Sequence, residues 1–407
     1  MKKIVSIILS FILLLSCSKK ETNKNSITVM IPDWAVPSED MLKAFEEESG
    51  VKVNMNILSW DNIKDKIAIA AAGGIAAADV VEVDWSWVGE FYSADLLVPI
   101  EISEEDKNSM PSIIPFTVDG KVLALPYAND FRIAYYNTNH FNKAGITKAP
   151  QTWNEVYDSI KKIKESGITK YPFSMPLSAS ENTTTSLIWL AYSKYGKVFN
   201  NDGSLNKEAV LGSLEFINQL LNVDKLIDPA NITANGLDPY RKINNGEASF
   251  IVGPTSFVSR IQDPNECTVV GEVIPTLLPG STSTSDRTFA LPEGLGVLKL
   301  SKNIEGAMKF VKWYNSATIQ KELNYIQNTM PTRLNVMQEL IYEGKLKNSE
   351  PLIEESKLIK SPFINGVPTY YAKMSTIIFN AVNQMAMGLI TPEEAFNNMD
   401  TKIKELL

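Results

Sequence analysis

Residues 27–83 alternate short apolar runs with helical segments, and this alternation limits the folds open to the chain. The runs at 27–31, 51–58 and 79–83 are typical of strands, and the two segments between them predict helices. A βαβαβ unit of this kind implies a parallel sheet with right-handed crossovers. We therefore expect an α/β fold whose first sheet begins at residue 27.

Tryptophan and carboxylate side chains follow each of the three predicted strands. They are Asp33 and Trp34, then Trp60, then Asp84, Trp85 and Trp87. In open α/β sheets, ligands bind at the carboxyl ends of the strands. A single tryptophan there is as often a core residue, because large aromatic side chains are mostly buried. Three such loops in succession predict that some of these side chains face a ligand.

The amino end carries an export signal. Lys2 and Lys3 precede an apolar run at residues 4–15, which is too short to span a hydrocarbon core of roughly 30 Å. Leu14-Leu15-Ser16-Cys17 resembles the lipobox of bacterial lipoproteins, in which the cysteine becomes acylated. We expect residues 1–16 to be a signal peptide, Cys17 to carry lipid and residues 17–25 to form a flexible tether.

Composition excludes several classes of protein. The 407 residues include 39 Lys and Arg against 47 Asp and Glu, for a net charge of -8, and 44% are hydrophobic. These values are those of a globular protein rather than a disordered or polytopic membrane protein. No basic block is present to neutralise phosphates, so nucleic acid is not an expected partner. The length predicts two or three domains.

A polar cluster interrupts an extended stretch in the middle of the first half. Asp119-Gly120 predicts a hairpin turn within residues 116–123. The following stretch at 125–137 is apolar except for Asn129, Asp130 and Arg132 and their neighbours. Asp130 and Arg132 are either an internal ion pair or hydrogen-bonding partners of a ligand.

The remaining signals describe alternating helices and strands. Thr152-Trp153-Asn154-Glu155 and Thr391-Pro392-Glu393-Glu394 are capping boxes that predict helices, with Trp153 as a core residue. Strands are predicted at 248–252 and 296–300. His140 is expected in a solvated loop, and Cys267 is expected to be a small buried hydrophobe.

The order of these motifs resembles that of the bacterial extracellular solute-binding proteins of family 1, the maltose-binding-protein-like group that serves ABC importers. The resemblance covers nearly the whole chain after the signal. The pieces that carry it are residues 78–83 with Trp87 to Phe91, residues 119–126, Tyr135-Tyr136-Asn137, Thr152-Trp153, residues 245–248 with Gly253, residues 294–297, and residues 391–395. Ala76-Ala77 departs from it, because the family usually has a proline before the aspartate.

The resemblance implies a two-lobed periplasmic-binding-protein fold, with a hinge and a ligand cleft between the lobes. We expect the N-terminal lobe to comprise residues 26–133 and 287–329. The C-terminal lobe would then comprise residues 134–286 and 330–407.

The resemblance further implies capture of a sugar or oligosaccharide and its delivery to the permease of an ABC importer. Aromatic rings would stack on the sugar, and polar groups would hold its hydroxyls. The expected ligand contacts are Trp34, Trp60, Asp84, Trp85, Asn129, Asp130, Arg132, Glu181, Asn182, Gly253, Pro254, Glu293 and Arg333. We expect a monomer without metal or cofactor, anchored by lipid in the cell envelope and facing the periplasm or the exterior.

Other readings stay open at this point. Polyamines would also use tryptophan and carboxylates, through cation–π and ionic contacts, and a glycerol-phosphate-like solute is a further option. Ferric iron would require tyrosines such as Tyr135-Tyr136 or Tyr370-Tyr371. An exported glycoside hydrolase would need a carboxylate pair such as Asp84 with Asp130. We expect a binding protein and not an enzyme, because nucleophile and metal-hydrolase motifs are missing from the sequence.

Overall fold

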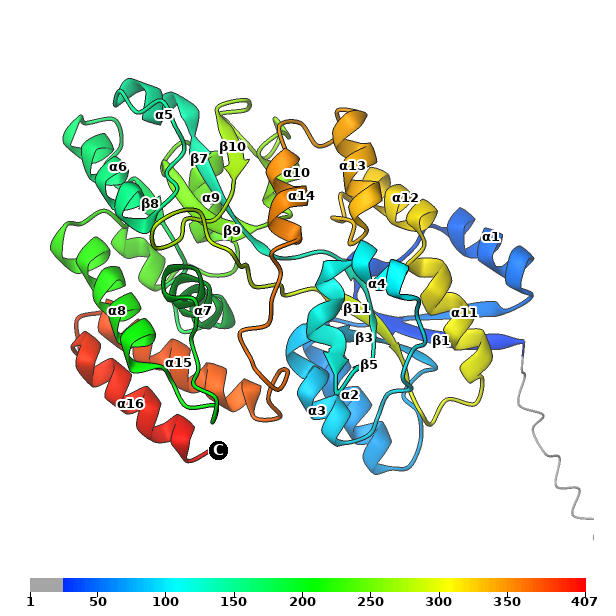
Figure 1. Ribbon diagram of the computed structural model, residues 1–407. Helices are drawn as coiled ribbons and strands as arrows, with labels where there is room; N and C mark the ends of the chain where they lie inside the picture. The colour runs from blue at the N-terminus through cyan, green and yellow to red at the C-terminus, as the bar shows by residue number, and fades with distance from the viewer. Residues whose placement is uncertain (1–24) are drawn as a thin grey trace, which may run out of the picture.

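The computed structural model describes residues 25–407, which form two α/β lobes, each built on its own sheet (Figure 1). The predicted signal peptide (1–16), the predicted lipid-bearing Cys17 and the tether (17–25) lie outside the described residues, apart from Asn25.

The first lobe is built on a five-stranded sheet. Its strands are β1 (Ser26–Ile31), β2 (Lys52–Ile57), β3 (Val80–Asp84), β6 (Leu125–Ala128) and β11 (Glu293–Val297), in the order β2-β1-β3-β11-β6. β1 pairs in parallel with β2 and β3, whereas β11 is antiparallel to β3 and β6. The parallel βαβαβ unit predicted from the sequence is confirmed.

Helices cover both faces of this sheet. Successive side chains of its strands point to opposite faces, and both faces carry apolar side chains. Ile27, Val29 and Ile31 pack against helices on one face, and Met30 packs against helices on the other. The elements of this lobe outside the sheet are α1 (Glu39–Ser49), α2 (Trp60–Ala72), α3 (Val88–Ser93), α4 (Glu104–Ser109), α11 (Ile304–Tyr314), α12 (Ala317–Gln327), and the 3₁₀ turns η1 (Asp33–Ala35), η2 (Trp85–Trp87) and η3 (Pro111–Phe116).

A short hairpin joins the first half of this lobe to β6. Its strands β4 (Thr117–Val118) and β5 (Lys121–Val122) are antiparallel. Asp119 and Gly120 both have positive φ, 48° and 74°, as a two-residue type I′ turn requires. The predicted hairpin is therefore confirmed.

The second lobe is built on a four-stranded sheet. Its strands are β7 (Arg132–Asn137), β8 (Phe173–Ser174), β9 (Phe250–Pro254) and β10 (Val273–Thr276), in the order β10-β7-β9-β8. The surrounding helices are α5 (Thr138–Lys143), α6 (Trp153–Glu165), α7 (Glu181–Tyr195), α8 (Lys207–Asn218), α9 (Asp238–Asn244), α10 (Phe257–Arg260), α13 (Leu334–Tyr342), α14 (Glu350–Ser356), α15 (Tyr371–Ala386) and α16 (Pro392–Lys404), with a π turn η4 (Gln219–Val223) and a 3₁₀ turn η5 (Pro229–Ile232).

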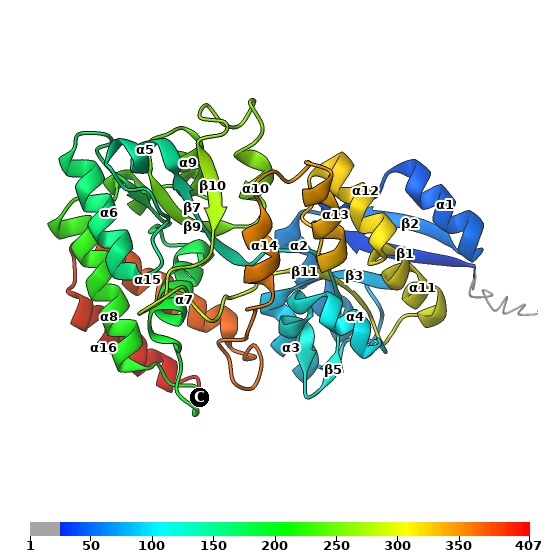
Figure 2. The same cartoon turned by 45° about the horizontal axis from the view of Figure 1, so that its top comes forward.

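The chain passes between the lobes at several points. It leaves the first sheet after β6 through residues 129–131 and returns between β10 and β11 through residues 277–292. Leu323 of α12 packs in the core of the first lobe, whereas Met337 of α13 packs in that of the second. Figure 2 shows these connections between the two lobes. Segments that cross in this way form a hinge.

Two local predictions are wrong. The strand expected at 296–300 begins three residues earlier, at Glu293, because antiparallel pairing with β3 sets its register. His140 is buried rather than solvated: the side chain of Asn137 caps α5, and this helix places His140 Nδ1 2.9 Å from the Ser249 hydroxyl. Burial lowers the pKa of His140. The prediction for Cys267 is confirmed, because it is a buried free cysteine.

Candidate functional site

Two cavities that share the lining residues Trp34 and Glu293 lie at the carboxyl ends of β1, β2 and β3, and together they are called the cleft. The first, of 560 Å³, lies between the lobes and is lined by Trp34, residues 127–130, Leu237, Ser256, Ser259, Arg260, Asp263, Glu266, Leu291, Glu293 and residues 327–330. The second, of 810 Å³, is lined by Asp33, Trp34, residues 57–60, Asp84 and Glu293. These volumes suit a small solute.

Trp34 and Trp60 both line the cleft. Trp34 lies in η1 after β1, is 47% exposed and donates a hydrogen bond from Nε1 to Glu293 Oε2 at 2.9 Å. Trp60 begins α2 after β2, is half-buried and packs on Trp87, with ring centroids 5.0 Å apart. Trp87 itself is buried in the core. Strand-end position thus puts two aromatic surfaces on the cleft.

Trp85 instead fills the space beside the cleft. It is 4% exposed and packs edge-on against Phe289 and Tyr371, with ring centroids 5.0 and 4.8 Å away. Tyr371 begins α15, so this contact joins the two lobes. Trp85 is absent from the lining of both cavities, and it acts as a packing residue.

Asp84 ends β3 and points one carboxylate oxygen at the cleft. Its Oδ1 accepts a hydrogen bond from the Ser86 backbone N–H at 2.8 Å and another from the Ser86 hydroxyl. Oδ2 has no hydrogen-bond partner among residues 25–407, and Asp84 lines the 810 Å³ cavity. Burial raises the pKa of Asp84 to about 7, against the opposing effect of Ser86.

Glu293 is the first residue of β11 and ends a chain of hydrogen-bonded groups. The Tyr127 hydroxyl lies 2.8 Å from Glu293 Oε2 and 3.0 Å from Oε2 of the fully buried Glu82. A hydroxyl has one proton, so Tyr127 can donate to only one of the two carboxyl groups at a time. The second hydrogen bond requires a proton on the other carboxyl group. Burial raises the pKa of Glu82 well above its usual range. The Tyr127 hydroxyl is placed to donate to either carboxyl group, and the raised pKa of Glu82 favours its protonated form.

Asn129, Asp130 and Arg132, which were predicted as ligand contacts, lie at the junction of the two sheets. Asn129 lines the cleft, and its Nδ2 donates to the Pro331 carbonyl at 3.1 Å. Asp130 also lines the cleft and accepts a hydrogen bond from Arg132 Nη1 at 2.7 Å. Arg132 is 4% exposed behind Asp130, with Nε unpartnered. Asp130 thus forms the ion pair with Arg132 and also lines the cleft.

Five other predicted residues are absent from the lining of the two cavities. Glu181 accepts hydrogen bonds from Tyr371 and Ser375, and Asn182 donates to the Gly236 carbonyl at 3.1 Å. Their carboxylate and amide groups stabilise contacts within the second lobe.

Gly253 and Pro254 are buried in β9, where the Pro254 carbonyl accepts a hydrogen bond from Tyr135. Arg333 donates to Asp106 at 2.8 Å and to the Asn315 carbonyl at 2.7 Å. Arg333 is held by these partners and is absent from the lining of the two cavities, and its predicted contact with a ligand stays a prediction. The predicted ligand contacts of Gly253 and Pro254 also stay predictions.

Several lining residues were missed by the sequence predictions. They are Tyr127, Leu237, Ser256, Ser259, Arg260, Asp263 and Glu266. Tyr127 lies in the quoted stretch at 125–137, two residues before Asn129. Arg260 and its neighbours follow Gly253-Pro254 in the chain. The sequence prediction therefore named a segment close to the cavity but not the residues that line it.

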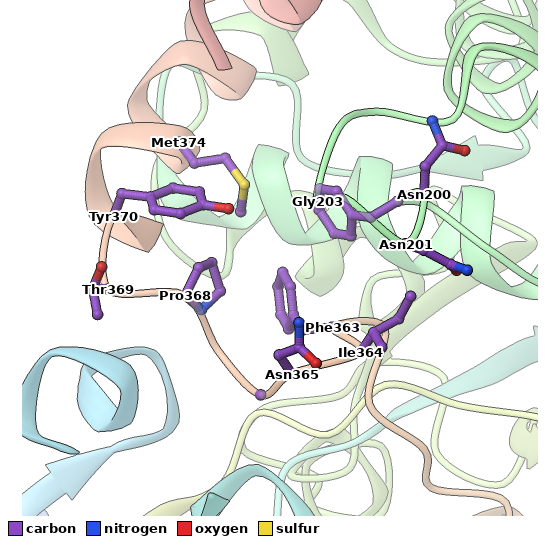
Figure 3. Close-up of a pocket in the computed structure, with 12 residues that line it drawn as sticks. Asn200, Asn201, Gly203, Phe363, Ile364, Asn365, Pro368, Thr369, Tyr370 and Met374 are labelled. Carbon is purple, nitrogen blue, oxygen red and sulfur yellow. The ribbon is translucent and has the colours of Figure 1, made fainter. Parts of the chain in front are cut away.

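A separate cavity of 240 Å³ lies in the second lobe (Figure 3). Phe363, Tyr370 and Met374 are among its lining residues, with Asn200 and Asn201 on the other side of it, and none of the lining residues within 25–407 is charged. Phe363 packs on Tyr371, which packs on Trp85, so an aromatic cluster lies between this cavity and Asp84. It shares no residue with the cleft.

No group of three or more His, Cys, Asp or Glu within residues 25–407 is arranged to hold a metal ion. Over the same residues, no helix has both the length and the apolar character needed to cross a bilayer.

Two α/β lobes joined by crossing segments, with a solute-sized cleft at the strand ends, define a two-lobed binding protein. A profile of the bacterial extracellular solute-binding protein family matches residues 33–321. The chain belongs to this family, as the sequence resemblance predicted.

Known relatives and solved structures match most of the chain. A relative from Brucella abortus (strain 2308), whose name describes binding but states no ligand, is 22% identical over 377 residues, covering 91% of this chain and 89% of that protein. Maltose-bound MalE3 of T. maritima has 24% identity and a TM-score of 0.74, covering 94% of this chain and 100% of that chain. A solute-binding protein of Agrobacterium radiobacter K84 in complex with ribitol has 19% identity and a TM-score of 0.78, covering 94% and 98%.

Proposed function

We propose that this protein is the substrate-binding component of an ABC importer and captures a sugar or polyol in the interlobe cleft. The observation that carries the proposal is the placement of Trp34 and Trp60 in one cavity with the free carboxylate oxygens of Asp84 and Glu293. The maltose and ribitol complexes of the two similar structures support this class of ligand.

The chemistry of the cleft suits a polyhydroxylated solute. The C–H face of a sugar or polyol is apolar and packs on an indole, while its hydroxyl groups donate to carboxylates and accept from N–H groups. Asp84 and Glu293 supply acceptors, and Asn129 and Ser256 add short polar groups along the same cleft.

Capture involves hinge closure. Ser256 and Arg260 belong to the second lobe and face Trp34 of the first across the 560 Å³ cavity. A solute that contacts both sides stabilises the closed arrangement, because it adds contacts that the open arrangement lacks. The closed lobes then present a surface to the permease.

The proposal includes the export signals. Cys17 would hold the protein to the membrane by lipid, with the lobes in the periplasm or outside the cell and residues 17–25 as a tether. The lobe boundaries near residues 133, 286 and 330 belong to the same proposal, as does a monomeric state.

The test is a thermal-shift screen of the purified protein against mono- and oligosaccharides, polyols, polyamines and ferric citrate. A ligand at 100 times its Kd stabilises the folded state by about 2.7 kcal/mol. We expect at least one sugar or polyol to raise Tm, and Trp60→Ala to reduce the shift. Tyr342→Ala is the matched control, because Tyr342 is 92% exposed on α13. A response only to iron would overturn the proposal.

A further inference from the structure

The lining of the cleft has a large excess of negative charge. Its charged residues are Asp33, Asp84, Asp130, Asp263, Glu266, Glu293 and Arg260, so six carboxylates face one guanidinium. Arg260 is ion-paired with Glu266, and Asp130 is paired with Arg132 behind the wall. Among the lining residues, this leaves Asp33, Asp84, Asp263 and Glu293 without a cationic partner.

Two of these carboxylates lie directly opposite each other in the sheet. Asp84 of β3 and Glu293 of β11 are cross-strand partners, so their side chains share one face. Each has one oxygen engaged by the protein: Ser86 bonds to Asp84 Oδ1, and Trp34 and Tyr127 bond to Glu293 Oε2. Asp84 Oδ2 and Glu293 Oε1 have no partner within residues 25–407.

Such a pair is unfavourable when both carboxylates are ionised. Like charges directly opposite destabilise a sheet, and Asp84 is only 8% exposed, so water screens it little. A cation placed between the two free oxygens would remove this cost. The indoles of Trp34 and Trp60 line the same cavity and offer π faces to a cation.

We propose that the cleft selects a solute bearing a protonated amine, such as an amino sugar or amino polyol, with the ammonium held between Asp84 and Glu293. This inference rests on the proposed function and narrows its substrate class. A phosphorylated or carboxylated solute is disfavoured, because the one lining cation, Arg260, is already paired.

The proposal makes binding dependent on pH. Asp84 is faced by Glu293 and Glu181 as well as Ser86, and Glu293 is faced by Trp34, Tyr127 and Asp130, with Glu82 behind Tyr127. Burial raises the pKa of Asp84 to about 7 and raises that of Glu293. At pH 7 a binding cation therefore expels protons from this pair, and its affinity rises as the pH rises from 6 to 8.

The experiment compares matched probes by isothermal titration calorimetry of the purified protein. Glucamine (1-amino-1-deoxysorbitol) is compared with sorbitol, glucosamine with glucose and with N-acetylglucosamine, and spermidine is added as an amine without hydroxyls. Glucamine keeps its charge between pH 6 and 8, as a lysine does, so its pH dependence reports on the protein. Titration in buffers of different ionisation enthalpy measures the protons released.

Variants assign the effect to the carboxylate pair. Asp84→Asn and Glu293→Gln keep the acceptor oxygens that Ser86, Trp34 and Tyr127 use but remove the negative charge. Glu305→Gln is the control, because Glu305 is an exposed carboxylate at the start of α11.

We expect glucamine to bind at least tenfold tighter than sorbitol, with proton release that Asp84→Asn reduces. Equal or tighter binding of sorbitol or glucose would overturn the inference and leave the proposed function standing. If spermidine alone binds, the ammonium site is supported, but the assignment of the solute as a sugar or polyol is overturned. If a sugar or polyol of the thermal screen binds but neither glucamine nor glucosamine does, the inference is overturned and the proposed function stands.

Discussion

The indole Nε1 of Trp34 donates a hydrogen bond to Oε2 of Glu293 at 2.9 Å, although 259 positions separate the two residues in the chain. The bond joins the loop after β1 to the first residue of β11, the strand on which the chain returns to the first lobe. It also fixes one edge of Trp34 while leaving 47% of the residue exposed at the cleft. An aromatic surface held in this way loses little further freedom when a solute stacks on it.

Trp34→Ala and Trp60→Ala should each weaken solute binding at least tenfold, or about 1.4 kcal/mol, because each removes a stacking surface. Titration calorimetry with a solute found in the thermal screen measures the loss. The fold should stay intact, and Tyr342→Ala should bind normally. Normal binding by both tryptophan variants would show that the solute lies elsewhere.

Asp130→Ala should lower the free energy of unfolding by about 3 kcal/mol, because it leaves the guanidinium of Arg132 buried without its ion-pair partner. Urea denaturation measures the loss. The double variant Asp130→Ala/Arg132→Met should recover most of it, since it removes both charges. Equal stability of Asp130→Ala and the natural chain would contradict this account.

Gly89→Ala should weaken solute binding at least tenfold and enlarge the radius of gyration in solution scattering. A Cβ on Gly89 of α3 would overlap the carbonyl oxygen of Val367, in the segment just before α15 of the second lobe. The lobes would then be held apart at this contact. Gly73→Ala is the control, because its Cβ would meet ordinary neighbours at 3.4 Å or more and its backbone φ is negative.

Glu355→Gln should flatten the pH dependence of stability. Glu355 is buried, its Oε2 accepts a hydrogen bond from the Leu278 backbone at 3.0 Å, and its Oε1 has no partner. Burial raises the pKa of Glu355 to about 8, from an ordinary value of 4.5. Between these values the folded state binds more protons than the unfolded state, so stability falls as the pH rises.

Glutamine keeps the acceptor for Leu278 and cannot ionise, so the variant should gain about 3 kcal/mol of stability over the natural chain between pH 5 and pH 8. Thermal unfolding from pH 5 to 9 checks this. Glu354→Gln, at the exposed neighbouring position, should follow the natural chain. A variant that keeps the natural pH slope would place the titration on another group.

Local sequence patterns determined much of the first lobe. The strands near residues 27, 51 and 79 were predictable because apolar runs and helix caps act over a few residues. Ser38 accepts a hydrogen bond from the Met41 N–H at 3.2 Å, and Gly50 ends α1 with φ of 69°. The same local rules placed Trp34, Trp60 and Asp84 at strand ends, where a parallel sheet gathers its ligand-binding loops.

Tertiary structure decided which of these side chains face the cleft. Trp34 and Trp85 both follow strands, but Tyr371 and Phe289, far along the chain, cover only Trp85. Glu293 lies opposite Asp84 because β11 returns antiparallel beside β3. Arg333 forms an ion pair with Asp106. Apolar spacing in the sequence predicted the parallel βαβαβ unit and the aromatic and acidic side chains at its strand ends, since both depend on neighbours in sequence. Which residues line the site depended on pairings between distant segments, and no local pattern contains these pairings.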